Sequence, residues 1–122
     1  MDKRFFFDSY AIIEGIKGNP NYDNYKDAGM VITKLNLFEV CYFLLRDFSE
    51  DKAIDFMENL SDCVVDFDSE IILIATKLKL SRKEDALSMV DCIGYVLSKS
   101  LNIKFLTGDK KFKDMENVEY VK

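Results

Sequence analysis

Four acidic side chains stand where acidic residues are uncommon, at the ends of apolar runs or inside them. They are Asp8, Glu39, Asp91 and Asp109. A carboxylate that is buried without a partner costs several kcal/mol or becomes protonated. Four such residues in a chain of 122 residues therefore indicate a shared cation. Carboxylate oxygens are hard ligands, which favour Mg²⁺ or Mn²⁺ over softer metals.

The chemistry of such a site is narrowed by the absence of histidine from the chain. Without histidine, the Ser-His and Cys-His nucleophile arrangements are excluded, and a catalytic zinc site is disfavoured. Cys41, Cys63 and Cys92 form no Cys-x-x-Cys pair, so we expect small buried side chains in a reducing compartment. Acid–base or metal chemistry must therefore depend on carboxylates, Lys, Tyr or water.

Three of the acids also have ordinary structural explanations, which the sequence leaves open. Asp8 could cap the helix that follows it. Asp91 has the spacing from Ser88 that is typical of a capping box. Asp109 could be a turn residue between two elements. Each acid taken singly is therefore ambiguous, and the argument for a site depends on the four together.

Glu39 has the weakest structural alternative, because it lies in the middle of a predicted helix and can cap nothing. The best alternative is a buried ion pair with Arg46 or Arg4. Asn36 lies one turn before Glu39 and could contact the same site. Glu14, on the helix after the first acid, is a candidate for a supporting acid.

Four further side chains next to the acids are candidates for supporting roles. Ser9 could hydrogen-bond a ligand or only the N-terminus of its helix. Thr107 could donate its hydroxyl near the metal, although a threonine at a strand end is usually structural. Lys110 and Lys111 could contact a phosphate group or simply be solvated.

The apolar pattern predicts strands that alternate with helices. Strands are expected at residues 5–7, 30–33, 63–67, 103–107 and 118–121. Helices are expected at residues 10–16, 34–48, 49–60, 68 to about 79, and 88 to about 100. The predicted fold is α/β, a three-layer α/β/α sandwich with a central, mainly parallel sheet. The helix at 34–48 is apolar almost all round, which predicts burial on more than one side, partly by another subunit.

This fold would bring the acids together. In an open α/β sheet, ligands bind in the crevice at the carboxyl ends of the strands. Asp8 and Asp109 both fall at such ends. Glu39 and Asp91 can reach the same crevice from flanking helices, so the sequence predicts one shared metal site.

Length and composition predict one soluble, cytoplasmic domain over residues 1–122. Hydrophobic residues make up 48% of the chain and include ten Phe, so a sizeable core can form. No segment has the length of a signal sequence's apolar region or of a membrane helix. The net charge of −5 argues against a broadly basic surface for nucleic acid. A nucleic-acid enzyme would need a local basic patch or a bound metal.

Four segments match, in order, the motifs of a known family. They are Phe-Phe-Phe-Asp-Ser (5–9), Ile-Thr-x-x-Asn-Leu-Phe-Glu (32–39), Ser-Met-Val-Asp-Cys-Ile (88–93) and Phe-Leu-Thr-Gly-Asp-Lys-Lys-Phe (105–112). The chain resembles the PIN domain family, particularly the stand-alone VapC-like toxin ribonucleases. One departure is the segment 92–96, Cys-Ile-Gly-Tyr-Val, which replaces a helix usually rich in alanine.

The resemblance implies an Mg²⁺- or Mn²⁺-dependent endoribonuclease that acts as the toxin of a toxin–antitoxin pair. By resemblance, Asp8, Glu39, Asp91 and Asp109 bind the metal and Thr107 assists. The metal would activate a water and stabilise the charge that develops on the cleaved phosphate, and a carboxylate would hold that water as general base. The resemblance further implies a homodimer and a small antitoxin that blocks the site.

Other functions are compatible with the same residues. A housekeeping RNA-processing nuclease and a non-cleaving RNA-binding PIN module share the fold. A receiver-type signalling domain would use Asp66 as its phosphoacceptor, but it normally needs paired acids where this chain has Asp8-Ser9. A haloacid-dehalogenase-like phosphatase would need an Asp-x-Asp pair at the same place.

Overall fold

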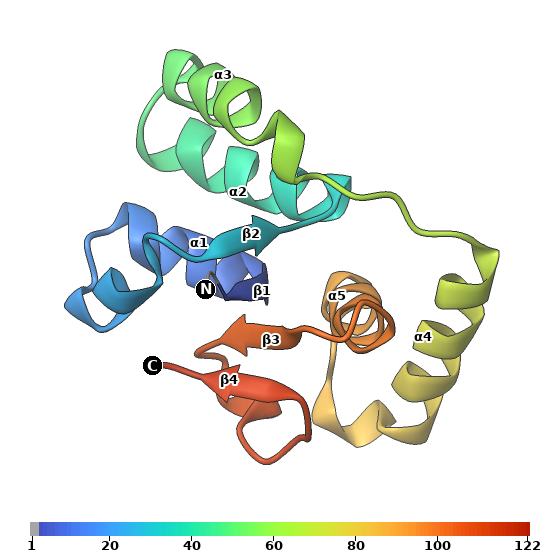
Figure 1. Cartoon of the computed structure of the whole chain (residues 1–122). Coiled ribbons are helices and arrows are strands. Elements are labelled where there is room, and N and C mark those ends of the chain that lie inside the picture. The colour runs from blue at the N-terminus through green and yellow to red at the C-terminus, as the bar shows by residue number, and fades with distance from the viewer. Residues whose placement is uncertain (1–2) are drawn as a thin grey trace.

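A sheet of four parallel strands forms the centre of the structure, a computed structural model that describes residues 3–122 (Figure 1). The strands are β1 (Arg4–Phe7), β2 (Gly29–Val31), β3 (Lys104–Thr107) and β4 (Val118–Tyr120). They lie in the order β2-β1-β3-β4, and every neighbouring pair is parallel. The chain leaves β1 toward β2 and returns to the other side of β1 with β3. The strand order therefore reverses between β1 and β3, where open α/β sheets bind ligands.

Helices cover both faces of this sheet because side chains alternate along each strand. Phe5 and Phe7 lie in a core with α1 (Ser9–Ile16), α2 (Lys34–Asp47) and α3 (Glu50–Asn59). Phe6 lies in a second core with α4 (Ser69–Ser81) and α5 (Met89–Ser100). Short 3-10 helices complete the fold: η1 (Pro20–Tyr25), η2 (Ser61–Cys63), η3 (Lys83–Asp85) and η4 (Lys110–Phe112). The predicted α/β sandwich with a parallel sheet is confirmed.

All predicted helices, and four of the five predicted strands, are present with bounds that differ by at most two residues. The strand predicted at 63–67 is wrong. Only one residue of this segment, Val64, makes a bridge, to Ile32 beside β2. Cys63 and Val64 pack in the first core, whereas Val65 and Phe67 pack in the second. The segment is apolar because it crosses the sheet edge between the two helical layers on its way from α3 to α4 (Figure 1).

Helix α2 is less buried than its composition predicts. Val40, Phe43 and Leu44 face the core, but Phe38 is 76% exposed and Tyr42 is 64% exposed. One chain therefore covers a single face of α2, and burial on a second side would require a partner.

No helix within residues 3–122 is long and apolar enough to cross a membrane.

Helix α5 approaches the sheet closely at Gly94. A Cβ atom there would come within 2.7 Å of the Phe6 ring and 3.1 Å of the Phe105 ring. These two rings stack with their centroids 5.8 Å apart and fill the space under the helix. Glycine at this position therefore lets α5 lie directly against the two rings.

Candidate functional site

A pocket of about 420 Å³ lies at the carboxyl ends of β1 and β3, and all four predicted acids line it. We call it the acid pocket. Asp8 directly follows β1, and Asp109 follows β3 by two residues. Glu39 comes from the first half of α2, and Asp91 from the first turn of α5. Four segments that are far apart in sequence therefore meet at the place where the strand order reverses.

Asp8 is the deeply buried member of the set, with 4% of its surface exposed. Its Oδ2 atom accepts a hydrogen bond of 2.8 Å from the Thr107 hydroxyl. Burial raises the pKa of Asp8 to about 7; the charges of Asp91 and Glu39 act in the same direction, and the Thr107 hydrogen bond opposes them. Although Asp8 occupies the cap position of α1, its side chain makes no capping hydrogen bond. The capping explanation therefore does not account for this carboxylate.

Glu39 is held by a short chain of polar side chains from α1 and α2. Its Oε1 atom accepts a hydrogen bond of 2.6 Å from the Ser9 hydroxyl, which in turn accepts one of 3.1 Å from Asn36. Asn36 is itself buried and fixed by the capping box that begins α2 at Thr33. The predicted supporting residues Ser9 and Asn36 thus orient Glu39.

The ion pair considered for Glu39 is not formed. Arg46 instead binds Asp47, with its Nε atom 2.8 Å from Oδ1. Within residues 3–122, Glu39 makes no ion pair with Arg4 either.

Asp91 and Asp109 are half-buried, and both also perform the structural roles considered for them. The Oδ2 atom of Asp91 accepts a hydrogen bond of 3.0 Å from the Ser88 amide, which closes the capping box of α5. The Oδ1 atom of Asp109 accepts one of 3.0 Å from the Lys111 amide at the start of η4. One oxygen of each side chain is thus used locally. The structural and functional explanations are compatible because a carboxylate has two oxygens.

The four acids line one pocket without forming a closed cage. Among residues 3–122, no three acidic, cysteine or histidine side chains stand close enough together to hold a metal ion as they are arranged here. The donor set nevertheless suits a hard cation, since it consists of carboxylate oxygens with hydroxyl groups beside them. The buried, charge-crowded Asp8 is the observation in favour of such an ion.

Three of the predicted supporting residues lie away from the acid pocket. Glu14 binds the Asn19 side chain at 3.0 Å and Lys17 at 3.7 Å. Lys110 and Lys111 line a separate small pocket, and Lys111 donates to the Ala86 carbonyl at 3.2 Å.

Several residues that line the acid pocket are absent from the sequence prediction. They are Tyr10, Ile13, Lys17, Tyr42, Phe43 and Arg46. Those on α2 follow Glu39 at positions +3, +4 and +7, which is the spacing of one helix face. This spacing could have identified the three α2 residues from the sequence, but only once Glu39 was known to face the pocket.

The PIN domain profile matches residues 5–118, which include all four acids. The chain belongs to the PIN domain family. No curated protein matches it in sequence. The predicted family is therefore confirmed by the profile.

Solved structures show the same fold at low sequence identity. A chain of a toxin–antitoxin complex from Klebsiella pneumoniae aligns with a TM-score of 0.75 and 18% identity, over 94% of this PIN domain chain and 95% of that chain. A chain of VapBC2 from Rickettsia felis, bound to a promoter DNA fragment, aligns with a TM-score of 0.72 and 16% identity. The alignment covers 98% of this chain and 99% of that chain. A chain of DNA-bound VapBC from Salmonella typhimurium aligns with a TM-score of 0.69 and 16% identity. The alignment covers 98% of this chain and 97% of that chain.

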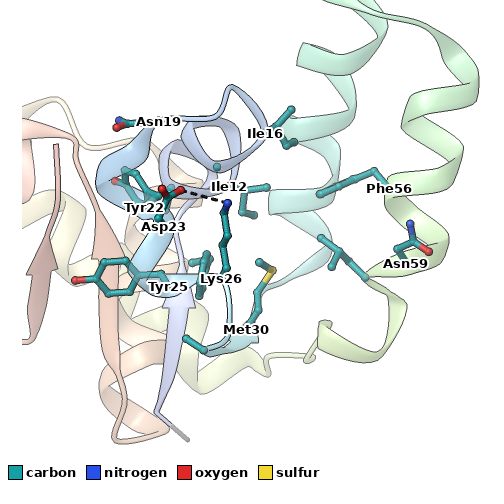
Figure 2. A pocket seen from close by; sticks show the side chains of 15 residues that line it. Ile12, Ile16, Asn19, Tyr22, Asp23, Tyr25, Lys26, Met30, Phe56 and Asn59 are labelled. Carbon is teal, nitrogen blue, oxygen red and sulfur yellow. Dashed lines mark ion pairs between the residues drawn. The ribbon is translucent and has the colours of Figure 1, made fainter.

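This PIN domain has a second pocket, of about 340 Å³, which opens from another face of α1 (Figure 2). Its lining is mainly apolar and includes Ile12, Tyr22, Met30 and Phe56. The charged pair Asp23 and Lys26 at its rim is joined at 3.3 Å, and none of the four acids reaches it. The four acids thus line the acid pocket and not this second pocket.

Proposed function

We propose that this PIN domain is an Mg²⁺- or Mn²⁺-dependent endoribonuclease and the toxin of a toxin–antitoxin pair. The observation that carries the proposal is the meeting of Asp8, Glu39, Asp91 and Asp109 at one pocket where the strand order reverses. Membership of the PIN family supports nuclease activity. RNA as the substrate, and the metal, are our extension of these two facts.

The four carboxylates would hold the metal, and their present separation means that they must draw closer to bind it. A bound Mg²⁺ or Mn²⁺ supplies a Lewis acid and a water of lowered pKa. Thr107 orients Asp8 by donating to Oδ2, and this hydrogen bond opposes the rise of the Asp8 pKa. Ser9 orients Glu39 by donating to its Oε1 atom. A carboxylate that is left partly free by the metal can accept the proton of the attacking water as general base.

Incubation of the purified protein with total cellular RNA tests the proposal directly. We expect new fragments with Mn²⁺ or Mg²⁺ that disappear with EDTA and with Asp91→Asn, whose amide oxygen can still accept the capping hydrogen bond from Ser88. Asp66→Asn is the matched control, since Asp66 is exposed and does not line the acid pocket. Cleavage that survives both EDTA and Asp91→Asn would contradict the proposed metal site.

The antitoxin partner is proposed from the structural neighbours, which are a toxin–antitoxin complex and two VapBC assemblies. Exposed apolar side chains support partners of some kind. On α2 these are Phe38, Tyr42 and Leu45, with Phe48 at the C-cap; on α4 they are Ile72, Leu73, Ile74 and Leu80. We assign the α4 face to a homodimer, because this helix lies at the outer side of the sandwich and its main contacts are with α5 (Figure 1). Light scattering with Leu73→Glu tests that assignment, and we expect a monomer.

The toxin and the housekeeping nuclease differ in regulation rather than in chemistry. A small protein encoded beside this chain that stops cleavage when added would favour the toxin. Cleavage confined to one precursor RNA, with no inhibitor, would favour RNA processing. On either assignment we place the protein in the cytoplasm with its RNA substrates.

A further inference from the structure

The acid pocket extends from the four carboxylates into a trough between α1 and α2. The trough is lined by Lys17 from the end of α1 and by Tyr42, Phe43 and Arg46 from α2. Along α2, Arg46 lies seven residues beyond Glu39, a rise of about 10 Å. The pocket is thus acidic at the strand ends, and aromatic and basic at the other end.

The cation and the ring at this end are held in a defined arrangement. Arg46 makes two hydrogen bonds to Asp47, of 2.8 and 3.1 Å, which fix the plane of the guanidinium group. Its Cζ atom lies 5.8 Å from the Tyr42 ring centroid and 5.9 Å from that of Phe43. Lys17 lies 5.9 Å from the Phe43 ring. Two cations therefore lie against one aromatic patch beside the acids. Each is also paired with a carboxylate, Lys17 with Glu14 at 3.7 Å and Arg46 with Asp47 at 2.8 Å.

Packing within the chain does not account for Tyr42. Its side chain is 64% exposed, and Phe43 beside it already fills the core position. An exposed ring next to a guanidinium offers a stacking surface for an unpaired base, and the cations offer contacts for its phosphate. Because the overall charge is −5, RNA bound at this site requires local cations to contact its phosphates.

We propose that this trough holds an unpaired nucleotide of the RNA next to the cleaved bond, with Tyr42 stacked on its base and Arg46 and Lys17 at its phosphate. The inference rests on the proposed function and assigns Tyr42, Arg46 and Lys17 to binding the RNA. The convergence of two cations beside the acids favours a nucleic acid over a protein occupant. A protein bound to the exposed face of α2 would engage Phe38 and Tyr42 alike.

Fluorescence anisotropy in EDTA measures binding of a labelled single-stranded RNA of random sequence without cleavage. The same strand annealed to its complement serves as the duplex probe. The variants are Tyr42→Leu, Tyr42→Phe and Arg46→Gln, and Phe38→Leu is the matched control because Phe38 is exposed on α2 but does not line the pocket. Far-ultraviolet circular dichroism checks that each variant folds.

We expect the single strand to bind better than the duplex. Tyr42→Leu should weaken single-strand binding roughly 5- to 150-fold, Tyr42→Phe should retain it, and Phe38→Leu should match the wild type. Arg46→Gln should weaken binding. It should also reduce the slope of the logarithm of the binding constant against the logarithm of salt concentration by about one. The inference is refuted if the wild type does not bind the single strand, or if Tyr42→Leu binds it as tightly as the wild type does. It is also refuted if Phe38→Leu loses as much affinity as Tyr42→Leu.

The cleavage assay separates this inference from the proposed function. If cleavage depends on metal but RNA affinity does not depend on Tyr42, the proposed nuclease activity stands and the nucleotide-binding role of the trough is refuted. If RNA affinity depends on Tyr42 but no cleavage occurs in Mn²⁺ or Mg²⁺, the nucleotide-binding role of the trough stands and the proposed nuclease activity is refuted.

Discussion

Replacing Asp8 by Asn should stabilise the metal-free protein at neutral and alkaline pH. Burial, aided by the charges of Asp91 and Glu39, raises the pKa of Asp8 from 3.8 to about 7 in the folded state. An acid whose pKa is raised on folding destabilises the fold wherever the unfolded chain is ionised. The penalty is absent below the unfolded pKa, grows between 3.8 and about 7, and is constant at higher pH. Asn has the same shape without the charge, and its carbonyl oxygen can still accept from Thr107.

The magnitude follows from the size of the shift. Each pKa unit corresponds to about 1.4 kcal/mol, so a shift of about three units gives a gain of about 4 kcal/mol above neutral pH. This is a large share of the roughly 5–15 kcal/mol by which domains of this kind are stable. The gain should fall to about half near pH 5.4 and to roughly a tenth near pH 3.8, where the unfolded chain also binds the proton.

Urea unfolding in EDTA, followed by circular dichroism at a series of pH values, measures the effect; the chain contains no Trp to report by fluorescence. Asp66→Asn, at an exposed position, is the control and should show no comparable gain. Added Mn²⁺ should stabilise the wild type by binding the folded state and should stabilise Asp8→Asn less. If Asp8→Asn is less stable than the wild type at about pH 8, or the difference is independent of pH, the reasoning about charge crowding is refuted.

Three further substitutions test the packing and hydrogen bonds around the site, each by urea unfolding. Thr107→Val should lower stability by about 1–3 kcal/mol at pH 8 and by less at pH 4, because the lost donor serves the ionised form of Asp8; an equal loss at both pH values would contradict this role. Gly94→Ala should cost about 1–3 kcal/mol, since the new Cβ would collide with two stacked rings, and a neutral result would mean that α5 can shift. Ser88→Ala should cost about 0.5–2 kcal/mol by removing the cap of α5, whereas Ser100→Ala at the other end of the helix should cost less.

Local signals in the sequence were sufficient for most of the fold. Strand β1 reads as a continuous apolar run because both its faces are covered, which is a property of each residue's immediate neighbours. The caps at Ser49, Asp68 and Ser88 were equally readable, because a capping side chain acts within its own helix turn. The four acids could be picked out for the same reason, since each one interrupts or ends a local apolar pattern.

Other features depend on which distant segments meet, and only the tertiary structure decided those. The segment 63–67 carries a strand-like composition, yet it crosses the sheet edge, and no local pattern distinguishes a crossing from a strand. Lys110 and Lys111 adjoin an acid in sequence but face another pocket, whereas Lys17 and Arg46 reach the acid pocket through the packing of α1 on α2. The sequence by itself thus determined which residues could do chemistry. The packing of helices on the sheet determined which of them lie together, because side-chain proximity across the fold is set by long-range contacts rather than by spacing along the chain.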